Sequence, residues 1–163
     1  MRARPRDLVV MGCALVLAAV SLSTGGWLSF QWRQDHLADA ARSESAVVAG
    51  RAVKGMYGYD FRTIDTQMAQ TAEDMTPSFR DNWLKVTATV LAPGAKEQEL
   101  VVEATVLETG IISAEADRTE VMVFMNQMSS GKNPAAGSFD TGLLRVSMER
   151  DDGRWLVAAV DPV

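Results

Sequence analysis

The feature that most constrains this chain is an uncharged stretch that runs from Leu8 to Trp32. It is 25 residues long, and its first part, Leu8–Val20, is apolar throughout. An α-helix rises about 1.5 Å per residue, so about 20 such residues cross the hydrocarbon core of a bilayer. Trp27, Phe30 and Trp32 lie at the far end, where aromatic side chains favour the membrane–water boundary. We therefore predict a single N-terminal transmembrane helix at residues 8–32.

Charges on the two sides of this helix predict its orientation. The side before it is basic, whereas the arginines after it are offset by Asp35, Asp39 and Glu44. The basic residues before it are Arg2, Arg4 and Arg6. Lys and Arg mark the cytoplasmic side of a membrane protein. Residues 1–7 are therefore predicted to form a cytoplasmic basic tail, with residues 33–163 outside the cytoplasm.

The same stretch also resembles a cleaved signal peptide, which has a basic start, an apolar middle and small residues before the cleavage point. Ser21, Ser23 and Gly25 are residues of that kind. Apolar and aromatic side chains continue past them, which favours an uncleaved anchor in the cytoplasmic membrane. Both interpretations place the rest of the chain outside the cytoplasm.

The composition of residues 33–163 argues against several classes of function. They carry 13 Lys and Arg against 20 Asp and Glu, a net charge of −7. That charge disfavours nucleic acid and anionic lipid headgroups as partners. The region contains no cysteine, because Cys13 lies in the membrane stretch, and the only histidine of the chain is His36. Zinc sites need three or four Cys, His or carboxylate ligands, so we predict no metal and no cofactor.

Helical patterns fill the first part of this region. Residues 33–59 are predicted to form a stalk helix with a narrow, alanine-rich apolar stripe, and a short helix follows from about Thr63 to Asp74, with Ile64 and Met68 inward. A third helix begins with Thr76 as N-cap and Pro77 at the first helical position. It is predicted to end at Pro93-Gly94 and to bury a face made of Phe79, Trp83, Val86 and Val90.

After Gly94 the periodicity changes to two, which is typical of strands. The first strand, from Leu100, is interrupted at Gly110, and this predicts a bulge and a bend. The next, Glu120–Met128, is apolar on both faces from Val121 to Met125, as in the centre of a sheet. Two further strands, around Leu144–Met148 and at Trp155–Val160, are joined by an Asp152-Gly153 hairpin.

Helices that precede a run of strands indicate an α+β fold with an antiparallel sheet. We predict an α+β domain at residues 60–163. In it, about three helices pack on a bent four-stranded antiparallel sheet, which makes a cone with a mouth.

Four short motifs follow the basic tail and the membrane helix. They are Tyr57-Gly58-Tyr59-Asp60-Phe61-Arg62, Thr76-Pro77-Ser78-Phe79-Arg80, Val121-Met122-Val123-Phe124-Met125-Asn126-Gln127 and Gly153-Arg154-Trp155-Leu156-Val157. In this order and spacing, and over nearly its whole length, the chain resembles the Mce-associated membrane proteins of actinobacteria. That family is accessory to the mammalian-cell-entry lipid transport systems.

The resemblance implies both a fold and a role. The fold is the NTF2-like cone that also forms the periplasmic part of VirB8-type secretion proteins. The role is that of a non-catalytic accessory or stabilising subunit of an Mce-type lipid importer in the cell envelope. Its partners would be Mce proteins and permease subunits, in the membrane. The resemblance transfers no catalytic residue.

The residues themselves offer little chemistry. Tyr57, Tyr59 and Asp60 are the one local cluster of the kind that ketosteroid-isomerase-like cones use, but they lie at a helix end, where Tyr packs and Asp caps. His36 is expected to be a solvated residue beside the membrane. The carboxylates most open to a metal interpretation are expected to be ordinary strand-end and turn charges: Glu97, Glu99, Glu103, Asp151 and Asp152. We therefore predict no enzymatic activity.

Two groups of residues are candidates for contacts with partners. Small residues recur on one face of the membrane helix, where they let another helix approach closely: Ala14, Ala18, Ser21 and Gly25. Asn126 and Gln127 end an apolar strand, where their amides either bind a ligand or partner backbone or tie down the Ser129–Ser138 loop. The loop contact is the favoured interpretation.

Two alternatives from other classes of function stay open. The chain could be a lipid- or sterol-binding module with its ligand in the cone, since methionines such as Met122, Met125 and Met128 suit an adaptable apolar pocket. It could also be a secretion-system scaffold of the VirB8 kind. An apolar cavity in the cone would favour the binding module, and a filled cone would favour the scaffold.

Overall fold

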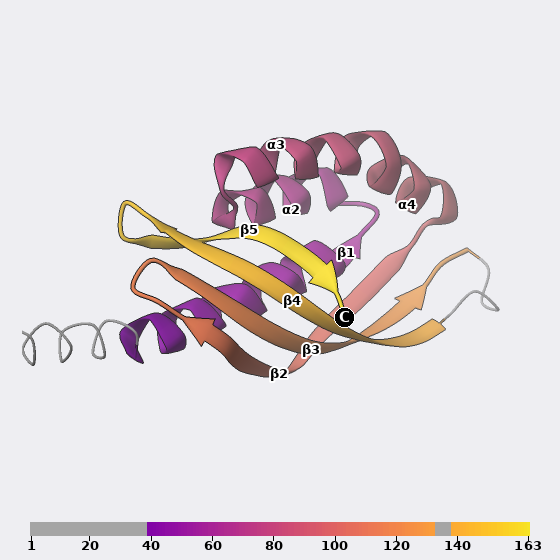
Figure 1. Cartoon of the computed structure of the whole chain (residues 1–163). Coiled ribbons are helices and arrows are strands. Elements are labelled where there is room, and N and C mark those ends of the chain that lie inside the picture. Colours follow the sequence, from indigo (N-terminus) through magenta and orange to yellow (C-terminus); the bar gives the residue numbers. More distant parts are fainter. Residues whose placement is uncertain (1–38, 133–137) are drawn as a thin grey trace, which may run out of the picture. The chain divides into compact units, whose positions relative to one another are not determined.

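A long helix over residues 39–57 opens the described structure (Figure 1). The computed structural model describes residues 39–132 and 138–163. The buried positions of the helix recur every three or four residues and are mostly small: Ala41, Ser45, Ala49, Ala52, Val53 and Met56. Such residues bring the helix backbone close to the sheet, and a Cβ added to Gly50 would lie 3.4 Å from Thr109 Cγ2. The helix ends at residue 57 instead of 59, because Tyr59 belongs to a strand.

That strand, β1 (Tyr59–Asp60), pairs antiparallel with Val101 and Val102. The prediction of a four-stranded sheet was therefore one strand short, since the described sheet has five strands in the order β1-β2-β3-β4-β5. Two residues are too few to produce an alternating pattern in a sequence. Gly58 lets the chain turn into β1, because a Cβ at this position would lie 3.3 Å from the Ala104 backbone nitrogen.

Helix α2 (Ile64–Thr71) continues into a 3-10 turn, Ala72–Asp74, and the two together match the predicted helix from about Thr63 to Asp74. Ile64 and Met68 are fully buried, as expected. They pack with Ala92 and Ala95 in a core that is smaller than the main one.

The third helix is longer than predicted. It begins as α3 (Pro77–Val86), with Thr76 at the N-cap position, although the Thr76 side chain makes no capping hydrogen bond. A π-helical segment, Thr87–Leu91, then leads directly into α4 (Ala92–Gln98). Pro93 falls in the first turn of α4, where proline is tolerated, so Pro93-Gly94 does not end the helix.

The π-helical segment also moves the buried face. Phe79 and Trp83 pack partly buried against the core, but Val86 and Val90 are 46% and 67% exposed, so the predicted apolar face was wrong there. A π-turn holds one residue more than an α-turn, which shifts Val90 and the later side chains around the axis, whereas Val86 precedes the segment and is exposed on α3 itself. The buried positions accordingly continue at Thr87, Ala92 and Ala95.

Four long strands form an antiparallel meander: β2 (Val101–Ala114), β3 (Arg118–Ser130), β4 (Ser138–Asp151) and β5 (Arg154–Pro162). β2 bulges at Leu107 and Ile112, on either side of Gly110 and not at Gly110 itself. Bulges increase twist and bend a strand, and the sheet is visibly curled (Figure 1). The predicted hairpin is present, with Asp152 at φ 45° and Gly153 at φ 78°.

Helices cover one face of this sheet. Val121, Val123 and Met125 of β3 are buried in a single cluster with residues of helix 39–57 and with Val146 and Met148 of β4. Trp155 belongs to the same cluster, and its Nε1 donates a hydrogen bond to Glu44 Oε2 at 3.2 Å. The partly buried Trp83 packs against both this main core and the smaller one beneath α2. Trp83 and Trp155 therefore connect the helices to the sheet.

Within residues 39–132 and 138–163, no helix is both long and apolar enough to span a membrane. The predicted transmembrane segment at 8–32 and the basic tail at 1–7 lie outside the described residues, as does residue 36. Residues 38–163 form one compact unit by their contacts.

We expect Trp155→Ala to destabilise the fragment 38–163 by ~3–5 kcal/mol, because the ring is 5% exposed and its loss leaves a cavity. Trp83→Ala should cost somewhat less, since that ring is only partly buried. Urea unfolding measures both. Val90→Ala, at a site 67% exposed, is the control and should change stability by less than ~0.5 kcal/mol. Equal losses of unfolding free energy for Trp83→Ala and Val90→Ala would contradict a helix that packs Trp83 against the core and exposes Val90.

Candidate functional site

The Tyr57–Arg62 motif lies where helix 39–57, β1 and α2 meet. Its backbone is fixed on both sides, because Phe61 N donates to Leu100 O at 3.0 Å and Asp60 N donates to Gln67 Oε1 at 3.0 Å. The motif therefore joins the end of β1 to the first turns of α2.

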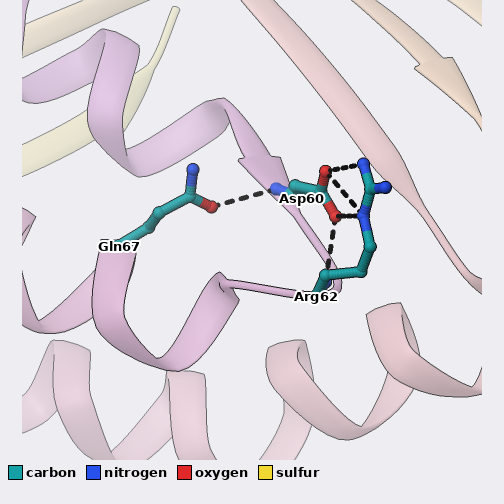
Figure 2. A network of polar contacts seen from close by, with 3 residues as sticks. All are labelled: Asp60, Arg62 and Gln67. Carbon is teal, nitrogen blue, oxygen red and sulfur yellow. Dashed lines mark hydrogen bonds and ion pairs between the residues drawn. The ribbon is translucent and has the colours of Figure 1, made fainter.

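Asp60 is the centre of a polar network that Figure 2 shows between Gln67 and Arg62. The Arg62 guanidinium donates to both carboxylate oxygens, from Nε to Oδ1 at 2.9 Å and to Oδ2 at 3.1 Å, and from Nη2 to Oδ2. The Arg62 backbone N–H also donates to Oδ1, at 2.9 Å. A carboxylate held in this way closes the turn between β1 and α2.

The network decides what the one acid–base cluster of the sequence can do. Hydrogen bonds from Arg62 lower the pKa of the Asp60 carboxyl to about 2, while burial raises the pKa of Tyr57 and of Tyr59. A general base works best when its pKa is near the operating pH, and Asp60 is far from that range. Its oxygens are also occupied by Arg62. The geometry fits a structural role for this motif.

A cleft of about 370 Å³ opens beside the motif, at the edge of β2. Lys54 of helix 39–57 and Gln67 of α2 line it together with residues of β1 and β2. The remaining lining residues are Gly58, Tyr59, Asp60, Val101, Val102, Glu103, Ala104 and Thr105. The lining mixes charged, polar and apolar groups, which differs from the mostly apolar lining of typical small-molecule pockets.

The two predicted amides face opposite sides of the sheet. Gln127 lies on the helix side and its Nε2 donates to Tyr57 O at 3.2 Å, so it binds the end of helix 39–57. Asn126 lies on the other side, where its Oδ1 accepts a hydrogen bond from Thr141 Oγ1 of β4 at 3.0 Å. The two ends of the Ser129–Ser138 loop are joined by a separate hydrogen bond, between Ser129 Oγ and Ser138 Oγ at 2.9 Å.

The remaining candidate residues are spread over the surface. Ala14, Ala18, Ser21 and Gly25 lie outside the described residues. The carboxylates Glu97, Glu99 and Glu103 are exposed, and Glu99 pairs with Lys132 at 3.2 Å. Over 39–132 and 138–163, no three His, Cys, Asp or Glu side chains come together as a metal site.

The second candidate surface is the face of the sheet that points away from the helices, which we call the open face. Its central positions, taken from strand alternation and register, are Glu103, Thr105 and Glu108 of β2, Met122, Phe124, Asn126 and Met128 of β3, and Phe139, Thr141, Leu143 and Arg145 of β4. Large apolar residues are exposed here: Phe124 39%, Leu143 38%, Met128 56% and Phe139 68%. Exposed apolar side chains grouped on one face make that face a candidate interaction surface.

The sequence contained a signal for this surface. Val121 to Met125 is apolar at every position, which predicted a strand buried on both faces. In the structure β3 is the central strand, but only Val121, Val123 and Met125 are buried by the described residues. Phe124 remains more than a third exposed. An apolar residue on the solvent side of a central strand is the pattern that marks the open face.

Comparison with known proteins gives relatives over nearly the whole chain. No known protein-family profile matches the sequence. The Mycobacterium tuberculosis protein named "Outer membrane protein Rv1973" is 29% identical over 148 residues, which cover 89% of this chain and 91% of that protein.

Solved structures share the fold. An IcmL-like type IV secretion system protein from Legionella pneumophila superimposes with a TM-score of 0.62 at 16% identity, covering 75% of this chain and 91% of that one. CagV from Helicobacter pylori, a VirB8 homolog, gives a TM-score of 0.55 at 10% identity, covering 74% and 97%. The chain therefore has the VirB8-like α+β fold, with helices on a curled antiparallel sheet, as predicted.

Asp60→Asn tests the network through its pH dependence. The lowered pKa of Asp60 means that the ionised carboxylate stabilises the folded state above the pKa of the unfolded chain, about 4, and that this contribution is lost as the pH falls through about 2. The difference in Tm between wild type and Asp60→Asn should be full near neutral pH and shrink between about pH 4 and pH 2. Asp81→Asn, at an exposed position on α3, is the control. A Tm difference that stays constant down to pH 2 would contradict the network.

Gly58→Ala tests the close contact of the motif with β2. The new Cβ would lie 2.9 Å from Lys54 O and 3.3 Å from Ala104 N, so the backbone must shift, and we expect a loss of ~1–3 kcal/mol. Gly94→Ala in α4 is the matched control. No atom lies within 4 Å of its Cβ position, and alanine favours a helix over glycine by ~0.5–1 kcal/mol. The two alanine variants should therefore shift the urea midpoint in opposite directions, and a shift of the same sign would contradict this contact.

Proposed function

We propose that this chain is a non-catalytic accessory subunit of an Mce-type lipid importer in the cell envelope. The observation that carries the proposal is the similarity to Outer membrane protein Rv1973, which spans 89% of this chain and 91% of that protein. The motif resemblance to Mce-associated proteins supports a role in such an importer, and the similarity to a protein named as an outer membrane protein supports an envelope location.

The proposed location follows from the N-terminal sequence. Residues 8–32 anchor the chain in the cytoplasmic membrane, with the Arg2, Arg4 and Arg6 side in the cytoplasm. The α+β domain then lies outside the cytoplasm. The fold supports this arrangement, because it is shared with a periplasmic fragment of TraM, at a TM-score of 0.60 and 7% identity over 74% of this chain and 95% of that one.

The absence of catalysis is part of the proposal. Asp60 is occupied by Arg62 and has a pKa of about 2, so the acid–base cluster of the sequence lacks a free base. The open face offers apolar side chains and a hydrogen-bonded Asn126–Thr141 pair. Such a surface binds a partner and does not transform a substrate.

One alternative is favoured by a specific observation. The solved structures that share the fold include a type IV secretion system protein and a VirB8 homolog, which supports a secretion-system scaffold. A lipid- or sterol-binding module has less support. Fully buried side chains of the main core occupy the space between helix 39–57 and the sheet, among them Val53, Met125 and Met148. A filled interior favours a scaffold over a binder.

The membrane helix supplies one test of the proposal. The small-residue face Ala14, Ala18, Ser21 and Gly25 is proposed to pack against a permease helix. Ala18→Leu should weaken co-purification of the permease from detergent-solubilised membranes, and Ala18→Leu with Gly25→Leu should weaken it further. Val16→Leu, off this face, is the control and should leave co-purification unchanged. Equal recovery of the permease with all variants would show that this face is not part of the interface.

Mass spectrometry of the material bound to the tagged wild-type chain tests the function itself. Mce proteins and permease subunits in stoichiometric amounts are the expected result. Secretion-system components in their place would establish the scaffold alternative, and a stoichiometric lipid without protein partners would establish the binding module.

A further inference from the structure

The open face has an organised pattern of charge as well as exposed apolar area. Reading the register across the sheet, Glu103 of β2 faces Met128 of β3, which faces Phe139 of β4. Four residues from Met128 along β3, Phe124 faces Glu108 of β2 on one side and Leu143 of β4 on the other. Each apolar row thus ends in a carboxylate on the β2 side. Leu107, inserted by the bulge beside Phe124, adds another residue that is 46% exposed.

From this pattern we infer that the open face docks one segment of a partner subunit that carries apolar side chains and at least two Lys or Arg residues. The inference rests on the proposed function, because the partner is taken to be a subunit of the same assembly. The apolar side chains of the partner segment cover the two rows of the open face that end at Phe139 and Leu143. The basic residues pair with Glu103 and Glu108.

Charge favours this occupant over a second copy of the chain and over anionic lipid headgroups. Neither Glu103 nor Glu108 forms an ion pair with any residue in the described parts of the chain. Two copies facing each other through this surface would each bring two carboxylates and a single cation, Arg145, so at least one carboxylate of each copy would stay unpaired among like charges, which is unfavourable at an interface. Anionic lipid headgroups are disfavoured for the same reason. A cationic segment removes the repulsion and gains attraction to both carboxylates.

The register also sets the spacing of the basic residues. Met128 and Phe124, which face the two glutamates, are four residues apart on β3, so the carboxylates are about 13 Å apart along the strands. A helical occupant covers that distance in about nine residues, at about 1.5 Å each. An extended occupant covers it in about four. The polar pair Asn126–Thr141 lies between the two apolar rows.

Site-specific photo-crosslinking in intact cells tests the inference on the full chain. A photoreactive phenylalanine replaces Phe124, Phe139 or Leu143 on the open face, and Val47 or Val90 on the exposed sides of helices as controls. The expected result is that the three open-face positions crosslink to one segment of a partner, and that sequencing of the crosslinked peptide finds apolar residues with Lys or Arg at the stated spacing.

Charge reversal makes the test specific. Glu103→Lys with Glu108→Lys should reduce the crosslink yield at least about tenfold, whereas Glu97→Lys with Glu115→Lys, which makes the same change of charge off this face, should not. Added salt should weaken crosslinking of the wild type more than that of Glu103→Gln with Glu108→Gln. These variants are at exposed positions, so folding is checked by the thermal melt of each.

Several results would overturn the inference. They are crosslinks to a second copy, to lipid or to an acidic segment, crosslinks from Val47 or Val90 alone, no crosslink from any position, and yields that charge reversal leaves unchanged. Failure of the proposed function is distinguishable from these. A basic apolar segment crosslinked to the open face but belonging to a protein outside the importer would leave the docking surface in place and refute the importer.

Discussion

The contact on which the rest of this structure depends is the packing of helix 39–57 against the curled sheet. It is close because the helix presents Ala41, Ala49 and Ala52, each at most 2% exposed, to the sheet residues of the main core. Interiors are packed at the density of organic crystals, so a larger residue on this stripe would displace the helix. The position of the helix in turn fixes Gly58 against Ala104 and thereby starts β1.

This arrangement buries one face of the sheet against the helices and leaves large apolar side chains exposed on the other. Val121, Val123 and Met125 point to the helices and are buried, while Phe124 and Met128, on the same strand, remain 39% and 56% exposed. The polar network around Asp60 belongs to the stabilising side, because it closes the turn between β1 and α2.

The sequence predicted the elements that have a periodic or local sequence pattern, and it missed the features that depend on contacts between distant residues. The α+β class, the short helix around Ile64 and the Asp152-Gly153 hairpin follow from local patterns and were confirmed. β1 was missed because two residues have no period, and its pairing with Val101 and Val102 exists only in the fold. Val90 was misplaced because it lies in a π-helical segment, which a helical wheel does not predict. The open face could not be predicted from the sequence, because only the structure shows that the described helices cover a single face of the sheet.

Methionine oxidation tests the central claim, that the open face is the assembly surface, most directly. Met128 is 56% exposed, while Met125 and Met148 are each 1% exposed and serve as internal controls in the same chain. The full chain is treated with a mild oxidant after purification in detergent and, separately, in its native membranes, and the sulfoxide at each site is quantified by mass spectrometry. The account predicts that Met128 reacts rapidly in the purified chain and is protected in membranes, with Met125 and Met148 slow in both. Equal reactivity of Met128 in the two preparations would contradict it.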